Sequence, residues 1–264
     1  GEIDMTHDAL PTDIFPRLQR DIPDEVKISP SLCTYYYEIN NQKAPFDDPR
    51  VRGALKLALD RDIIADKVMG QGQKAAFGFT PPSTVDMEAI EPQWFKLTQK
   101  ERNEMAKQLL EEAGYNSSNP LTFNLLYNTS ESHKKVAIAA ASTLKQNAGI
   151  NVKLENQEWK TFLDSRHQGN YEVARAGWCA DYNEPSSFLN IMLSTSSNNT
   201  SHYKSEEFDE AMRNSITAKT EADRVKAYQA AEVILDKDST IVPIYYYVKP
   251  RLVKPYVGGY SVNN

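Results

Sequence analysis

The sequence has few cysteines, no long apolar run and no excess of positive charge. Its 264 residues contain no stretch of about 18 apolar residues, the length that a membrane-spanning helix needs. Lys and Arg number 30 against 36 Asp and Glu, which gives a formal net charge of −6. Domains that grip nucleic acid usually carry clustered basic residues instead. We therefore expect no membrane insertion and no nucleic-acid partner.

Residues that commonly carry catalysis or bind metals are also scarce. The four histidines (His7, His133, His167 and His202) form no i, i+4 pair and have no neighbouring cysteine. A metal site needs three or four converging ligands. No serine elbow, glycine-rich phosphate loop or HExxH motif is present. We expect no metal, no cofactor and no enzymatic activity.

Tyrosine is abundant by contrast. Six of the 14 tyrosines stand in two runs, Tyr35 to Tyr37 and Tyr245 to Tyr247. A tyrosine combines an apolar ring with a polar hydroxyl, so it suits binding surfaces as well as cores. The sequence alone leaves both uses open.

Only two cysteines are present, Cys33 and Cys179, and their distant positions match no zinc or redox motif. They are either two buried thiols or a long-range disulfide. In the chain-entropy model such a disulfide would stabilise the fold by roughly 4–5 kcal/mol.

Helix and strand patterns alternate through most of the chain. A capping box at Thr98 and Glu101 predicts a helix start, as does Asp48-Pro49. Between 121 and 178 the order strand, helix, strand, helix, strand indicates a sheet with helices packed on it. The expected strands are 32–39, 121–127, 151–155, 171–178 and 240–248; the expected helices are 49–59, 61–69, 98–114, 132–147, 158–167, 185–193, 205–218 and 221–237.

Two long stretches show neither pattern. Residues 1–30 contain four prolines at intervals too short for a helix interior, so we expect them to be irregular. Residues 70–97 are rich in glycine and proline, and we expect a surface excursion without regular structure.

The predicted strand near residue 175 has an unusual composition. Where a buried strand usually has Val, Ile and Leu, this one contains Arg175, Gly177 and Trp178, with Asp181 just beyond its end. Alternation places Arg175, Gly177, Cys179 and Asp181 on one side. At ~3.3 Å per residue, the two charged residues lie up to about 20 Å apart.

This arrangement suggests a binding site for a zwitterionic peptide. The missing side chain of Gly177 would let an extended peptide pair with the strand. Asp181 would take the α-ammonium group and Arg175 would reach toward the carboxylate. The alternative is that the two charged residues bond elsewhere and that Trp178 is a core residue.

Five long runs of the sequence carry a family resemblance. They are LCTYYYEINNQKAPF at 32–46, VRGALKLALDRDII at 51–64, LENQEWKTFLDSRHQG at 154–169, ARAGWCADYNEPSSFLN at 174–190 and YYYVKPRLVKP at 245–255. These runs resemble the periplasmic oligopeptide-binding proteins of bacterial ABC importers, in the peptide/nickel class of solute-binding proteins. The resemblance implies an α/β fold, a periplasmic-binding-protein-like lobe with a mixed sheet flanked by helices.

Family members are about twice as long, with two lobes that close on the peptide and a third domain alongside. The resemblance therefore implies that this chain is the C-terminal lobe. Residues 1–30 would lead in from an N-terminal lobe, 31–248 would form the peptide-binding lobe and 249–264 would return toward the other lobe.

The resemblance also implies roles for individual residues. Asp181 matches the anchor for the peptide amine, while Gly177 and Cys179 match backbone partners of the peptide. Cys33 and Cys179 match the family's disulfide, which fits an oxidising periplasm. Arg175, Arg166 and His133 match the carboxylate end, and Trp178, Trp159, Glu38, Tyr36 and Tyr247 match the walls of the side-chain pockets.

Two positions depart from the family pattern. Met69 stands where close relatives carry a lysine thought to help meet the carboxylate, and Asp8 stands where they carry an asparagine. His133 and Arg175 remain as the expected carboxylate partners, and the preference for peptide length is left open.

The implied function is binding without catalysis. We expect a monomeric, periplasmic protein that binds short peptides through their main chain and termini and presents them to a membrane permease. One alternative is a chaperone-like or structural interaction domain that binds extended polypeptide segments. A peptidase is a third reading.

Overall fold

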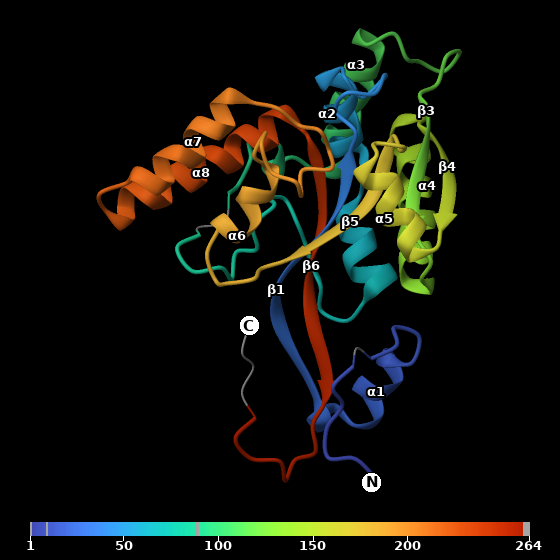
Figure 1. Ribbon diagram of the computed structural model, residues 1–264. Helices are drawn as coiled ribbons and strands as arrows, with labels where there is room; N and C mark the ends of the chain where they lie inside the picture. The colour runs from blue at the N-terminus through green and yellow to red at the C-terminus, as the bar shows by residue number, and fades with distance from the viewer. Residues whose placement is uncertain (1, 9, 88–89, 261–264) are drawn as a thin grey trace.

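A mixed sheet organises the molecule (Figure 1). The computed structural model describes residues 2–8, 10–87 and 90–260, and in this part of the chain six strands pair in the order β2-β6-β1-β5-β3-β4. β3 runs parallel to β4 and to β5, and the other pairs are antiparallel. The strands are β1 Val26–Ile39, β2 Lys74–Ala75, β3 Thr122–Asn128, β4 Asn151–Gln157, β5 Val173–Cys179 and β6 Ile241–Leu252.

The parallel part of the sheet consists of two consecutive strand-helix-strand units that share β4. Helix α4 (Glu131–Ala148) connects β3 to β4, and helix α5 (Trp159–His167) connects β4 to β5. Both β4 and β5 therefore lie beside β3, one on each edge. This arrangement confirms the alternation predicted for 121–178 and the mixed sheet flanked by helices.

Helices cover the two faces of the sheet, and the sheet separates two main cores (Figure 1). One core contains residues of α2 (Pro49–Ala58), α3 (Gln99–Glu112) and α4; the other contains residues of α6 (Ser186–Leu189), α7 (Glu206–Thr217) and α8 (Glu221–Asp238). Tyr35 and Tyr37 enter the first core and Tyr36 enters the second, because successive side chains of a strand point to opposite faces. None of the described helices is both long enough and apolar enough to cross a membrane.

The helix starts predicted from capping residues are confirmed. The Thr98 hydroxyl accepts a hydrogen bond from the Glu101 N–H, and the Glu101 carboxylate accepts one from the Thr98 N–H, which completes the capping box of α3. The Asp48 side chain accepts from the Arg50 N–H at the start of α2. These local signals satisfy backbone donors that a helix start leaves free.

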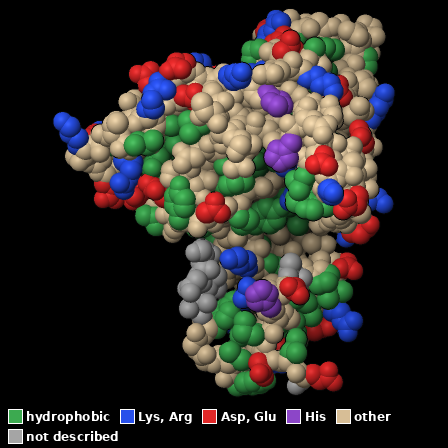
Figure 2. All heavy atoms as spheres, viewed as in Figure 1, with side chains coloured by type: hydrophobic (Ala, Val, Ile, Leu, Met, Phe, Trp, Pro, Cys, Tyr) green, Lys and Arg blue, Asp and Glu red, His purple; other side chains and the backbone are tan. Residues whose placement is uncertain are grey.

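The expectation that residues 1–30 are irregular is wrong from Phe15 onward. A short helix, α1 (Phe15–Asp21), begins with Pro16 in its first turn, where a missing N–H costs nothing. A single 3₁₀ turn, Pro23–Glu25, then leads into β1. Pro30 lies within β1, where only β6 pairs with the strand, and a strand with one free edge tolerates proline. β1 and β6 thus extend beyond the sheet as a two-stranded ribbon (Figure 1). In the space-filling view this ribbon and α1 form a part that is narrower than the body above it (Figure 2).

The expected surface excursion at 70–97 is also wrong in part. It contains β2 and a 3₁₀ helix, Gln93–Lys96, and its aromatic residues Phe79 and Trp94 are buried. Residues 88–89 lie outside the described residues. The preceding helix, expected at 61–69, is a π-helix at Ile63–Met69 that ends at Gly70 in a left-handed conformation.

Candidate functional site

Part of β5 has a free edge. β5 pairs with β1 from Val173 to Cys179, but β3 pairs with β5 only as far as Ala174. The backbone beyond Ala174 therefore has a strand on one side only, among the residues that the structure describes. An exposed strand edge of this kind accepts an extended chain as an additional strand.

The residues whose backbone groups face this edge follow from the ladder with β1. The Ala180 N–H donates to the Leu32 carbonyl at 2.8 Å, so the even-numbered residues of this segment direct their N–H and C=O groups toward β1. The alternation turns the groups of Arg175, Gly177 and Cys179 away from β1. Because the groups of Ala174 face β1, its parallel pairing with Leu126 uses the N–H of Arg175, so the free edge offers the Arg175 carbonyl and the N–H and C=O groups of Gly177 and Cys179.

Arg175 lies at one end of the free edge and has only neutral partners among the described residues. Its Nη2 donates to the Tyr247 hydroxyl at 2.9 Å, and its Nη1 donates to Oδ1 of Asn128 at 3.4 Å. Its Cζ lies 5.0 Å from the ring centroid of Tyr35, and its Nε is buried without a partner. A guanidinium with neutral neighbours keeps a positive charge that a ligand carboxylate could neutralise.

His133, on α4, lies close to Arg175. Its ring centroid is 5.6 Å from that of Tyr35, the same tyrosine that lies below the guanidinium. Burial, together with the positive charge of Arg175, lowers the pKa of His133 to about 3. The imidazole is therefore neutral near pH 7, and Arg175 supplies the charge at this end of the edge.

We predict that His133 makes the free energy of unfolding decrease as the pH is lowered below about 6.5. An unfolded histidine titrates near pH 6.5, whereas the folded one stays neutral down to about pH 3, so the unfolded state binds more protons across this window. Stability contributed by the neutral imidazole is full above about pH 6.5 and is lost as the pH falls toward 3. Urea unfolding at pH 7 and pH 5 should show a smaller pH effect in His133→Gln than in the wild type. A His133 NMR titration with a midpoint near 6.5 would contradict the prediction.

Other expected site residues lie on the opposite face of the sheet. Arg166, on α5, pairs with Glu38 at 2.8 Å, and the Thr200 hydroxyl donates to the same carboxylate at 2.7 Å. Tyr36 is buried on this face against Phe79. The structure therefore does not bring Arg166 beside Arg175, and Glu38 already has two polar partners.

The two tryptophans are partly accessible. The Trp178 indole N–H donates to the Ser187 carbonyl at 2.6 Å, which fixes a half-buried ring beside the free edge. Trp159 is 49% exposed and stacks on Phe162. Both rings therefore keep part of their aromatic surface accessible.

Asp181 lies two residues beyond the end of β5 and is exposed. Its backbone N–H donates to the Ser187 hydroxyl at 2.8 Å, which holds the turn after the strand. Among the described residues its carboxylate forms no ion pair, so it can accept an ammonium group. The free edge is thus bounded by an unpaired cation and an unpaired anion.

Cys33 and Cys179 form the expected disulfide. They stand directly opposite each other in the β1–β5 register, at the end of β5. Met69, by contrast, is buried in the core beside α4, and Asp8 is exposed next to His7. No group of three His, Cys, Asp or Glu side chains suited to a metal occurs in the described part of the chain.

Sequence reasoning did not identify Asn128 and Tyr35 as partners of Arg175. Asn128 is the last residue of β3, and Tyr35 belongs to a run that was open to either a core or a binding use. Only the pairing of distant strands brings both to the guanidinium.

Comparison with known proteins gives the same fold and relates the chain to a family. It is 62% identical over 261 residues to the periplasmic oligopeptide-binding protein OppA of Salmonella typhimurium, across 99% of this chain and 48% of that protein. It is 46% identical over 264 residues to the periplasmic murein peptide-binding protein MppA of Escherichia coli, across 100% of this chain and 49% of that protein.

A solved structure, Haemophilus influenzae OppA in complex with RPPGFSPFR, matches with a TM-score of 0.90 and 54% identity, covering 98% of this chain and 51% of that one. The chain spans about half the length of the curated relatives it matches. Residues 1–200 match the family model described as bacterial extracellular solute-binding proteins, family 5 middle. The chain therefore belongs to family 5 of the bacterial extracellular solute-binding proteins.

Proposed function

We propose that this chain is one lobe of the solute-binding component of a periplasmic oligopeptide importer. It binds short peptides through their main chain and termini, without catalysis, as part of a monomer that delivers them to a membrane permease. Residues 31–248 form the lobe, and 1–30 and 249–264 connect to the other lobe. The observation that carries the proposal is the free edge of β5, bounded by the unpaired charges of Arg175 and Asp181.

The free edge accounts for tolerance of peptide sequence. An added strand bonds to the C=O group of Arg175 and to the N–H and C=O groups of Gly177 and Cys179, which any peptide can match. Asp181 takes the peptide ammonium and Arg175 takes the carboxylate. Trp178 and Trp159 flank the ligand side chains without fixing their identity, since hydrated pockets accept varied groups.

The chain alone should bind weakly. Its relatives are about twice as long, and a peptide held by one lobe keeps one side in water. Calorimetry with a Lys-rich tripeptide should detect no binding at micromolar or tighter Kd for the 264-residue chain. The peptide should be recovered intact after long incubation, whereas cleavage would favour a peptidase.

Asp181→Asn is expected to weaken the binding of peptides with a free amine at least tenfold in the two-lobed protein. A tenfold change corresponds to about 1.4 kcal/mol, and an ammonium that loses its carboxylate partner in a closed site costs at least that much. An N-acetylated version of the same peptide is the control, since its affinity should be the same for wild type and variant.

Two outcomes would contradict the role of Asp181. Equal affinity of wild type and Asp181→Asn for the free peptide would remove it as the ammonium anchor. Binding of unfolded protein, independent of any free amine, would favour the chaperone-like alternative.

A further inference from the structure

The space beside Gly177 is filled from within the chain. A Cβ atom added at Gly177 would lie 3.1 Å from Nη2 of Arg175 and 3.4 Å from the Tyr247 hydroxyl. These two atoms are the donor and acceptor of the 2.9 Å hydrogen bond described above. The Arg175 side chain therefore passes over position 177 to reach Tyr247.

The requirement for glycine here is one of space. Gly177 is not among the described glycines with a positive φ, so its backbone conformation is open to any residue. The missing side chain would project perpendicular to the sheet, on the face that holds Arg175 and Tyr247. An added strand would instead lie in the plane of the sheet, along the free edge. The space left by the absent side chain is therefore occupied by the guanidinium, whereas an added peptide strand would lie elsewhere.

The path of the Arg175 side chain over position 177 fixes the orientation of its guanidinium group. Arginine has many rotamers, and its planar group binds a carboxylate well only when it is held in place. Tyr247 holds one end of the guanidinium, Asn128 contacts the other and the ring of Tyr35 lies below it. The polar partners are neutral, so they orient the group without neutralising it.

We propose that Gly177 is a positioning residue for Arg175, and that it thereby sets the preference of the site for peptides with a free C-terminal carboxylate. This inference rests on the proposed function. A Cβ atom at 177 would push the guanidinium a few tenths of an ångström out of its position and disturb its hydrogen bond to Tyr247. Because Nη2 is the far end of a flexible side chain, the displacement should leave the fold intact and change the recognition of the carboxylate.

The test compares one peptide in its free-acid and C-terminally amidated forms, using calorimetry on the two-lobed protein. We expect the wild type to prefer the free acid. In Gly177→Ala the affinity for the free acid should fall about tenfold, while the affinity for the amide is unchanged. The Kd of the amide divided by the Kd of the free acid should therefore fall toward one. Thermal unfolding should be close to that of the wild type.

Two further variants make the test specific. Tyr247→Phe removes the hydroxyl that holds the guanidinium, so it should lower the same ratio. The double variant Gly177→Ala/Tyr247→Phe should lower the ratio little further, because both changes break the same hydrogen bond between Arg175 and Tyr247. Gly258→Ala is the matched control, since its added Cβ meets no atom within 4 Å, and it should keep the wild-type ratio.

The outcomes separate this inference from the function on which it rests. If the wild type binds neither form, the proposed function fails and the inference with it. If the wild type binds both forms equally, Arg175 does not recognise the peptide carboxylate, and the positioning role of Gly177 is refuted as well. If the wild type prefers the free acid and Gly177→Ala retains the full preference, the role of Gly177 alone is overturned.

Discussion

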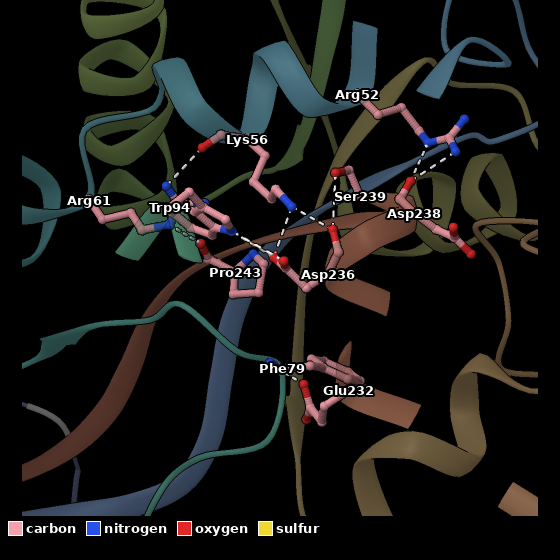
Figure 3. Close-up of polar contacts among 10 residues, drawn as sticks. All are labelled: Arg52, Lys56, Arg61, Phe79, Trp94, Glu232, Asp236, Asp238, Ser239 and Pro243. Carbon is pink, nitrogen blue, oxygen red and sulfur yellow. Dashed lines mark hydrogen bonds and ion pairs between the residues drawn. The ribbon is translucent and has the colours of Figure 1, made fainter. Parts of the chain in front are cut away.

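Replacing Asp236 by alanine is expected to lower the free energy of unfolding by about 3–5 kcal/mol, because it leaves a buried ammonium group without its carboxylate partner. Lys56 of α2 donates to the Asp236 carboxylate of α8 at 2.8 Å, and the Lys56 side chain is 7% exposed. The Trp94 indole N–H donates to the same carboxylate at 2.9 Å (Figure 3). Urea unfolding of the chain at pH 7 measures the loss.

The surroundings of Lys56 explain why the effect should be large. Burial lowers the pKa of Lys56, and the Asp236 carboxylate opposes that shift. Lys56 also lies over the Trp94 ring, and the fully buried Arg61 lies over the same ring at 4.9 Å. Without the carboxylate, two cations would share one aromatic ring, and Lys56 would keep only the Asp236 backbone carbonyl and the weaker attraction of Asp238.

A neighbouring ion pair provides the matched control. Lys237 follows Asp236 in α8 and pairs with Glu207 at 3.4 Å, but both side chains are more than half exposed. Lys237→Ala should therefore cost less than about 1 kcal/mol. The double variant Lys56→Met/Asp236→Leu should cost less than Asp236→Ala, because the ammonium of Lys56 is removed together with its carboxylate partner. A loss in Asp236→Ala no greater than that in Lys237→Ala would refute the argument.

Local signals were sufficient to predict most helices and strands. The capping box at Thr98 predicted α3, and Asp48 predicted α2, because each motif satisfies backbone groups within a few residues. Prolines misled the prediction, since Pro16 and Pro30 were interpreted as breakers. Pro16 lies in a first helical turn and Pro30 in a strand with a free edge, and only the structure shows these settings.

Of the candidate site, the sequence could predict only which residues of the single strand β5 lie on the same side. The prediction that Arg175, Gly177 and Cys179 share a side of the strand is consistent with the register of β5. The departure of β3 from β5 after Ala174 depends on how distant strands pair, so no local pattern reports it. For the same reason the contact of Arg175 with Tyr247, 72 residues away, could not be foreseen.

Removing the disulfide, in the double variant Cys33→Ala/Cys179→Ala, is expected to lower the free energy of unfolding by about 2–5 kcal/mol. The two cysteines are 146 positions apart, so the bond closes a long loop and restricts the unfolded chain strongly. Cys33 also lies where the β1–β6 register shifts, between Pro30 and Thr34, so the bond ties β1 to β5 at an irregular point. Urea unfolding of oxidised wild type and double variant measures the difference.

The denaturant dependence identifies the state on which the disulfide acts. If the bond mainly restricts the unfolded chain, its removal exposes more surface on unfolding, and the slope of the unfolding free energy against urea should rise. Cys179 is exposed, so a reductant can reach the bond; it should lower wild-type stability toward that of the variant and leave the variant unchanged. Equal stability of oxidised wild type and variant would refute the prediction. A loss with an unchanged slope would place the effect in the native β1–β5 pairing, where faster amide exchange from Arg175 to Cys179 should accompany it.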